Sequence, residues 1–302
     1  MTVDEINEKI LSLGELSGVD IFRVGYSLLG VPIYGVHIGN YTGKQIILTG
    51  AIHAREYVTS LLLIEMVRYL YNKEINGGFY FVPLMNPDGV NLVLSGTSKL
   101  PCDKLREFIL LVNDGSEDFS YWKANANAVD MNVNFDAGWG GGVQNVFCPA
   151  PANFVGYYPN SEREVRSLID FSLKNMPAMT IDYHTRGEVI YYGFDTQDAK
   201  ARADNLKIAS DIAEVTGYTV ERSEGSVGGY QDWSIDTLKV PSVTIEVGNA
   251  NMSYPITDEY LPELFERNKD VPLVALNSIN KIYSQATRVN GKRMWKGLSL
   301  RK

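Results

Sequence analysis

Short apolar runs alternate along the chain with longer amphipathic segments, and this alternation limits the fold more than any other feature of the sequence. Several runs are continuously apolar, as in strands that helices cover on both faces of a sheet. The alternation predicts one α/β domain with a mixed, twisted sheet of about eight strands and helices on both faces. The predicted strands are 21–27, 33–39, 45–51, 79–84, 178–184, 188–193 and 240–248, and the predicted helices are 3–13, 59–72, 103–113, 161–175, 198–216 and 258–284.

The composition favours a single domain over residues 1–302, because no repeat or Pro/Ser-rich linker divides the chain. The basic segment 290–302 is expected to be a solvated tail. A net charge of -8 argues against a nucleic-acid partner, which would need a basic surface. Cys102 and Cys148 have no metal-binding spacing and are expected to be free thiols or, at most, one bridge.

The N-terminal segment 1–16 is acidic and amphipathic, and it lacks the basic and apolar regions of a secretory signal. No apolar run approaches the ~20 residues that a membrane-spanning helix needs. The sequence as given therefore predicts a cytoplasmic protein without a membrane span, or an extracellular protein if a leader has been removed. It does not predict an oligomeric state.

Candidate chemical residues gather at the ends of predicted strands. The segment HARE (53–56) follows one strand, His184 ends another, and Glu246 lies near the end of a third. Ligand sites in open α/β sheets lie outside the carboxyl ends of the strands. We therefore expect these residues to share one site.

The H-x-x-E pair of His53 and Glu56 could bind one metal ion if the strand turns into a helix there. Catalytic zinc usually takes three protein ligands, so a third must come from elsewhere. Of the other histidines, His37 lies inside a predicted strand without an acidic neighbour and suits a structural role, which makes His184 the better candidate. An isolated H-x-x-E pair is more often a surface pair, so this pattern alone does not establish a metal site.

A series of motifs in a fixed order spans residues 20–284. They are GYSLLGVPIYGVHIG, GAIHARE, NPDG, DMNVNFD, the strand ending in His184, GGYQDW and TIEVG. Together they resemble the zinc carboxypeptidase family. The resemblance implies the fold of that family and a zinc-dependent peptidase.

The resemblance also implies a role for individual residues. His53, Glu56 and His184 would bind one Zn²⁺ ion, and Glu246 would be the general base that activates a water and then protonates the leaving amine. Asp130 would be the hydrogen-bond partner of the His53 ring nitrogen that does not bind the metal, and it would fix the tautomer of His53. Without the resemblance, Glu246 would equally suit a salt-bridged strand end, and Asp130 a turn.

The sequence departs from the family pattern in the substrate-binding segment. Members that remove a C-terminal residue hold its carboxylate with an Asn-Arg pair, and here Asn132 is kept but Val133 replaces the arginine. Valine cannot donate to a carboxylate. Lys123, in YWKANA, aligns with the oxyanion-stabilising arginine of the family and keeps its positive charge. Glu224 stands where many members have a mobile tyrosine, so that role is not assigned here.

The segments WKANA, DMNVNFDAGWG and YHTRGEVIYY resemble the bacterial branch that cleaves γ-D-glutamyl-diaminopimelate bonds. This resemblance predicts a murein-derived peptide substrate and hydrolysis of the γ-D-Glu–meso-diaminopimelate (or lysine) amide. Arg186 is expected to contact a substrate carboxylate and to offset the missing arginine, and Arg55 to face the substrate cleft. Surface positions remain the alternative for Arg55, Arg186 and Lys123.

Three other hypotheses remain. An ordinary exo-carboxypeptidase for L-peptides is disfavoured by Val133. An inactive zinc-bearing module that binds peptides is disfavoured because Glu246 is present with all three ligands. A deacylase of small amino acids is disfavoured by the match through GGYQDW.

Overall fold

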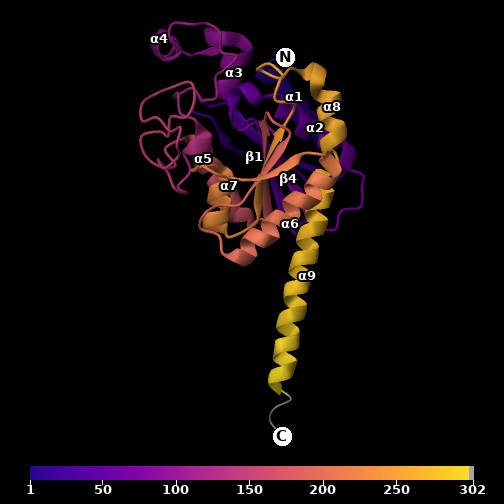
Figure 1. Ribbon diagram of the computed structural model, residues 1–302. Helices are drawn as coiled ribbons and strands as arrows, with labels where there is room; N and C mark the ends of the chain where they lie inside the picture. The colour runs from indigo at the N-terminus through magenta and orange to yellow at the C-terminus, as the bar shows by residue number, and fades with distance from the viewer. Residues whose placement is uncertain (299–302) are drawn as a thin grey trace.

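One eight-stranded sheet forms the centre of the molecule, and helices cover both of its faces (Figure 1). The computed structural model describes residues 1–298, with 285–298 as helical backbone only. The strands are β1 (Val19–Tyr26), β2 (Pro32–Gly39), β3 (Gln45–Gly50), β4 (Gly78–Val82), β5 (Met179–Thr185), β6 (Val189–Tyr192), β7 (Thr219–Arg222) and β8 (Ser242–Val247).

The order of the strands in the sheet is β1-β2-β4-β3-β5-β8-β6-β7. The central strands β4, β3, β5 and β8 run parallel to one another. On either side of this centre, β2 runs antiparallel to β4 and β6 runs antiparallel to β8. The mixed α/β fold predicted from the sequence is thus confirmed. Because β3, β5 and β8 are adjacent and parallel, their carboxyl ends meet at one edge of the sheet.

Helices pack on the sheet from two sides and form two apolar cores. The helices are α1 (Val3–Ser12), α2 (Val58–Leu70), α3 (Pro87–Ser95), α4 (Asp103–Val112), α5 (Arg163–Asn175), α6 (Ala199–Thr216), α7 (Tyr230–Trp233), α8 (Leu261–Asn268) and α9 (Val271–Leu298). In β3, Ile46 and Leu48 belong to the core with α1, α2, α6, α8 and α9, while Ile47 belongs to the core with α5 and α7. Alternate residues of a strand face opposite sides, which explains why this strand is apolar throughout.

The structure contains elements that the sequence did not predict. Strand β7 is short and mostly exposed, so it has no apolar pattern to reveal it. Helix α3 begins at NPDG, which is also a turn signature, but here Asn86 caps the helix and Pro87 occupies its first position.

The predicted helix 258–284 is divided into α8 and α9. Pro272 stands at the second position of α9, where its missing N–H cannot continue the preceding helix. The basic segment expected at 290–302 lies outside the residues whose side chains are described.

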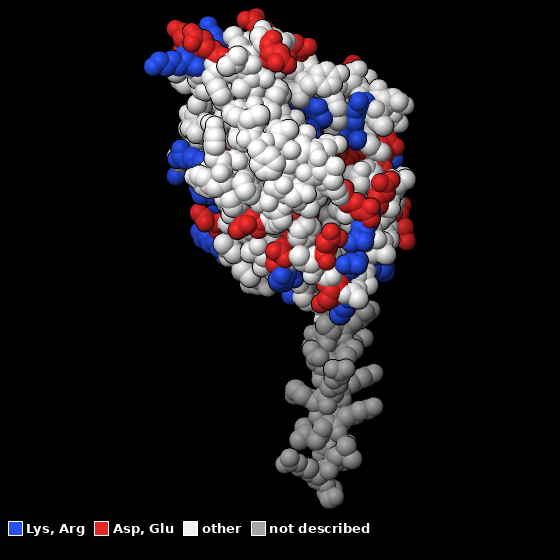
Figure 2. Space-filling view, turned by 60° about the vertical axis from the view of Figure 1, so that its left-hand side comes forward, with Lys and Arg blue, Asp and Glu red and all other residues white. Residues whose placement is uncertain are grey.

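One side of the molecule is nearly free of charge. The segment 137–161 contains no Lys, Arg, Asp or Glu and exposes Phe147, Tyr157 and Tyr158. Figure 2 brings this side forward as a broad uncharged face with charged residues at its margins. The backbone N–H of Asn153, within this segment, donates to Asp130, so the uncharged face adjoins the candidate site.

Candidate metal centre and active site

The chain turns sharply after β3, and this turn places the side chains of His53 and Glu56 on the same side of the backbone. His53 is extended and directly precedes a 3₁₀ turn at Ala54–Glu56. Side chains three residues apart lie above one another in such a turn, so His53 and Glu56 point the same way. The backbone N–H groups of Ala54 and Arg55 donate to carbonyls of the segment Trp122–Lys123, which fixes the turn in place.

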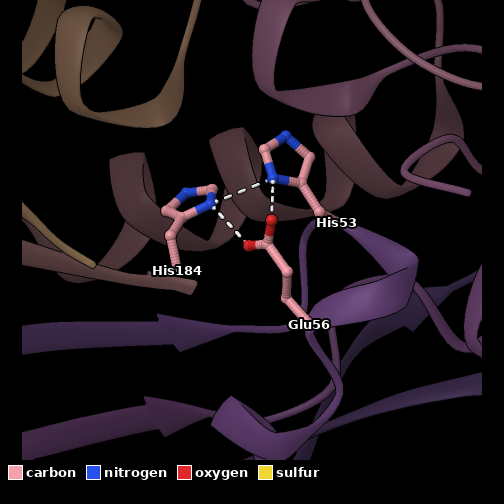
Figure 3. A group of neighbouring side chains, drawn as sticks. All are labelled: His53, Glu56 and His184. Carbon is pink, nitrogen blue, oxygen red and sulfur yellow. Dashed lines mark hydrogen bonds and ion pairs between the residues drawn. The ribbon is translucent and has the colours of Figure 1, made fainter. Parts of the chain in front are cut away.

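His184 joins this pair from the end of β5, the strand next to β3. Nδ1 of His53 lies 3.0 Å from one carboxylate oxygen of Glu56, and Nδ1 of His184 lies 3.0 Å from the other. The two Nδ1 atoms are 3.1 Å apart. Figure 3 shows the three side chains converging on one point. They are buried and form a group that could hold a metal ion.

The donor set fits a zinc ion. The Nε2 atoms of His53 and His184 lie 3.1 Å and 2.9 Å from the carboxylates of Asp130 and Asp182. An Nε2–H that donates to a carboxylate leaves Nδ1 as a lone-pair donor. Two nitrogens bound tetrahedrally to zinc are about 3.3 Å apart, close to the separation that the two Nδ1 atoms have here.

Asp182 is the residue of this group that the sequence analysis missed. Its carboxylate also accepts a hydrogen bond from the hydroxyl of Thr49 on β3. The sequence could have indicated Asp182, because it precedes His184 by two positions and residues two apart on a strand share a face. Asp130 is held similarly, by the backbone N–H groups of Asn132 and Asn153.

Strong electrostatic interactions link the three side chains of the group. Burial would raise the pKa of Glu56, but His53 and His184 outweigh it and hold the pKa well below its usual value. Burial would lower the pKa of His184, but Asp182 and Glu56 outweigh it and raise the pKa well above its usual value. A metal ion must displace the proton from His184, so metal affinity rises with pH.

Glu246 lies on β8 opposite His184 of β5 in the parallel register. Burial raises the pKa of Glu246 to about 7; His184 opposes this rise and Glu56 adds to it. Its Oε2 atom is buried and has no hydrogen-bond partner among the residues that the structure describes. A carboxyl group with a free oxygen and a pKa near neutral can accept a proton and return it.

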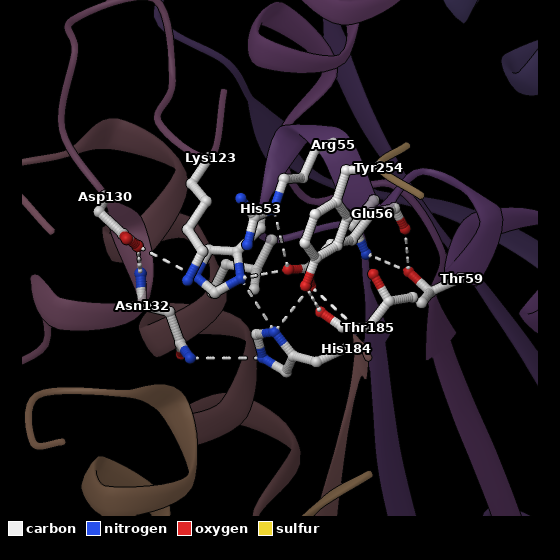
Figure 4. A network of polar contacts seen from close by, with 12 residues as sticks. His53, Arg55, Glu56, Thr59, Lys123, Asp130, Asn132, His184, Thr185 and Tyr254 are labelled. Atoms are coloured by element: carbon white, nitrogen blue, oxygen red, sulfur yellow. Dashed lines mark hydrogen bonds and ion pairs between the residues drawn. The ribbon is translucent and has the colours of Figure 1, made fainter. Parts of the chain in front are cut away.

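Two further predicted residues lie around the metal group. Burial would raise the pKa of Asp130, but His53 and the positive charge of Lys123 outweigh it, and the same charge opposes the rise that burial causes in the pKa of Glu246. The amide nitrogen of Asn132 lies 3.3 Å from Nε2 of His184. Val133 is buried with its backbone against Gly228, whereas the side chain of the neighbouring Asn132 reaches the site (Figure 4).

Arg55 and Arg186 meet at a tyrosine that the sequence analysis did not identify. Their guanidinium carbons lie 3.7 Å and 4.6 Å from the ring centroid of Tyr254. The Tyr254 hydroxyl donates to the backbone carbonyl of Thr185, next to His184. One Arg186 nitrogen donates to backbone carbonyls of the segment 250–252, so a substrate carboxylate would have to use its other donors.

Asp182 should strengthen metal binding through His184. We expect Asp182→Asn to weaken zinc affinity by ~10-fold or more, because an uncharged partner lowers the basicity of the ligand. Competition with a chromophoric chelator measures this affinity. The control is Asp170→Asn, which removes the same charge at an exposed position of α5. Equal zinc affinities in the two variants would contradict the role of Asp182.

Comparison with known proteins places this geometry in context. A family described as zinc carboxypeptidase matches residues 16–270. The γ-D-glutamyl-L-diamino acid endopeptidase 1 of Lysinibacillus sphaericus is 30% identical over 255 residues, which cover 78% of this chain and 62% of that protein. The chain thus spans less than two thirds of the length of that relative.

Solved structures share the fold at lower sequence identity. The carboxypeptidase A of Helicoverpa armigera has a TM-score of 0.75 at 18% identity, covering 92% of this chain and 73% of its own. A murein-tripeptide amidase from Escherichia coli O157 has a TM-score of 0.53 at 21% identity, and the match covers 86% of this chain and 91% of the amidase chain. Within the described residues, no helix has the length and apolar character to cross a membrane.

Proposed function

Because the chain belongs to the zinc carboxypeptidase family, we propose that it hydrolyses an amide in bacterial cell-wall peptides, specifically the bond from γ-D-glutamate to meso-diaminopimelate or lysine. Family membership makes the chain a zinc metallopeptidase. The similarity to the L. sphaericus endopeptidase, whose name states a bond between γ-D-glutamate and an L-diamino acid, carries the proposal of the substrate.

The segment around Asn132 supports a substrate other than an ordinary C-terminal residue. In this segment a buried Val133 stands beside Asn132, where the resemblance leads us to expect an arginine in exo-carboxypeptidases. An amide alone gives a free carboxylate a weaker hydrogen bond than a bidentate arginine does. This difference favours a substrate that is recognised by other groups as well.

The chain's own residues suffice for the proton transfers of amide hydrolysis. His53, Glu56 and His184 would hold the zinc ion, which when bound polarises a carbonyl and lowers the pKa of a water. Glu246 would take a proton from the attacking water through its free Oε2 and deliver it to the leaving amine. The positive charge of Lys123 would stabilise the negative charge that develops on the scissile carbonyl oxygen.

The substrate is tested with two peptides and one variant. We expect the zinc-loaded protein to release diaminopimelate from L-Ala-γ-D-Glu-meso-diaminopimelate and to leave an all-L tripeptide intact, as followed by mass spectrometry. Glu246→Gln should lower kcat by roughly 10² to 10⁴-fold, because the proton acceptor is lost.

Zinc content and the folded state of Glu246→Gln, measured beside the wild type, serve as controls. Cleavage of the all-L peptide alone would identify an exo-carboxypeptidase. Full activity of Glu246→Gln would contradict the role of this carboxylate.

The pH profile tests the same role independently. Glu246 must be ionised to accept a proton, so kcat/KM should fall as the pH drops through its pKa. A bound cation lowers this pKa from the value of about 7 that burial gives. We therefore expect an acid limb of unit slope below pH ~7. A rate that stays constant as the pH falls from ~7 to ~4 would contradict the assignment.

A further inference from the structure

The uncharged face formed by the segment 137–161 takes no part in the proton transfers of the reaction. Phe147 and Tyr157 are each 67% exposed on it, and Tyr158 is 59% exposed (Figure 2). Large apolar groups that gather on one surface, in contrast to those that stand singly, indicate contact with a partner. The face therefore calls for an occupant whose chemistry matches it.

Local packing holds the aromatic rings of this face in place. The ring of Tyr157 meets the buried ring of Phe154 edge-on, with the ring centroids 5.4 Å apart. The ring of Phe147 lies against Gly140, where an added Cβ would be 3.5 Å from it. A short parallel bridge between Val146 and Phe154 joins the two stretches that bear these rings. Rings that are fixed in advance lose little conformational entropy when a ligand covers them.

Neutral hydrogen-bonding groups lie in the same segment. Gln144 is exposed, and Asn145 and Asn153 are half-buried. Amides both donate and accept hydrogen bonds, so they suit the hydroxyl and N-acetyl groups of a sugar. An anionic polymer would find no Lys or Arg in 137–161. Aromatic rings with neutral amides and no charge therefore favour a neutral sugar polymer, whose apolar C–H faces stack on the rings.

Backbone hydrogen bonds connect the uncharged face to the catalytic residues. The N–H of Asn153 donates to Asp130, which also binds His53. The N–H of Lys123 donates to the carbonyl of Pro151. In cell-wall polymers the peptide is attached to the glycan through its L-alanine, so only alanine and the γ-linked glutamate separate the sugar from the scissile bond. Two extended residues span roughly 7 to 10 Å, which brings the sugar of such a substrate to a surface beside the site.

We propose that the uncharged face binds the glycan strand to which the substrate peptide is attached. Phe147, Tyr157 and Tyr158 provide rings on which sugar rings stack. Gln144 provides hydrogen bonds to hydroxyl and N-acetyl groups. The identity of the glycan rests on the proposed function, whereas the preference for a neutral sugar polymer rests on the face itself.

The contribution of the glycan is measured with two substrates that share one scissile bond. One is L-Ala-γ-D-Glu-meso-diaminopimelate, and the other is the same tripeptide linked to the disaccharide N-acetylglucosaminyl-N-acetylmuramic acid. We expect kcat/KM of the zinc-loaded protein to favour the disaccharide substrate by ~10-fold or more, because stacking adds binding energy remote from the reacting bond. Tyr157→Ala should remove most of this preference and leave kcat/KM for the free tripeptide unchanged.

The matched control is Tyr41→Ala. Tyr41 is 55% exposed and lies in the loop before β3, at the opposite end of that strand from the site, so its removal should keep the wild-type ratio. Equal kcat/KM for the two substrates in the wild type, or an equal ratio in wild type and Tyr157→Ala, would overturn the assignment of the face.

A binding measurement separates this inference from the proposed function. Calorimetric titration of the zinc-loaded protein with the neutral tetramer of N-acetylglucosamine should show binding that Tyr157→Ala weakens several-fold. Binding of the tetramer without cleavage of either substrate would support the face and overturn the proposed bond. Cleavage of both substrates with no preference and no binding of the tetramer would overturn the face alone.

Sedimentation of the two proteins tests the other occupant of such a face, a second copy of the chain. We expect the wild type and Tyr157→Ala to have the same oligomeric state. A wild-type dimer that Tyr157→Ala converts into a monomer, without binding of the tetramer by either, would assign the face to subunit contact and overturn the glycan.

Discussion

Carboxylates buried around two histidines create the electrostatic problem on which the rest of the site depends. Glu56, Asp130 and Asp182 are almost fully buried within hydrogen-bond distance of His53 or His184. Ionised groups are costly in the protein interior unless positive charge compensates them. The two histidines provide this compensation when protonated, and a divalent cation provides it when they bind as neutral ligands. The same arrangement therefore aligns the ligands and gives the site its affinity for a cation.

The general architecture was predictable because it follows from apolar periodicity. Strand β3, apolar on both faces, marked the parallel centre of the sheet, and the residues that follow such strands marked the edge where the site lies. Strand β7 escaped prediction because it is short and exposed at the edge of the sheet, where burial imposes no pattern. The break between α8 and α9 could have been read from Pro272, whose effect on the chain is local.

The site was predictable to the extent that local motifs define it. His53, Glu56 and His184 stand in recognisable segments, and the structure brings them together. Tyr254 could not be found this way, because its contacts with Arg55 and Arg186 join segments distant in sequence. Whether Arg186 contacts a substrate carboxylate remains a prediction.

The distance along the chain between the histidines has a consequence for how the protein matures. His53 and His184 are separated by 131 positions and meet only where β3 pairs with β5. During synthesis, the first half of the molecule can therefore offer an ion only two of its three ligands. Full metal loading must wait for the sheet to assemble, and an ion bound there cross-links a long loop, as a disulfide would. Occupancy of the centre therefore reports that β3 and β5 have paired.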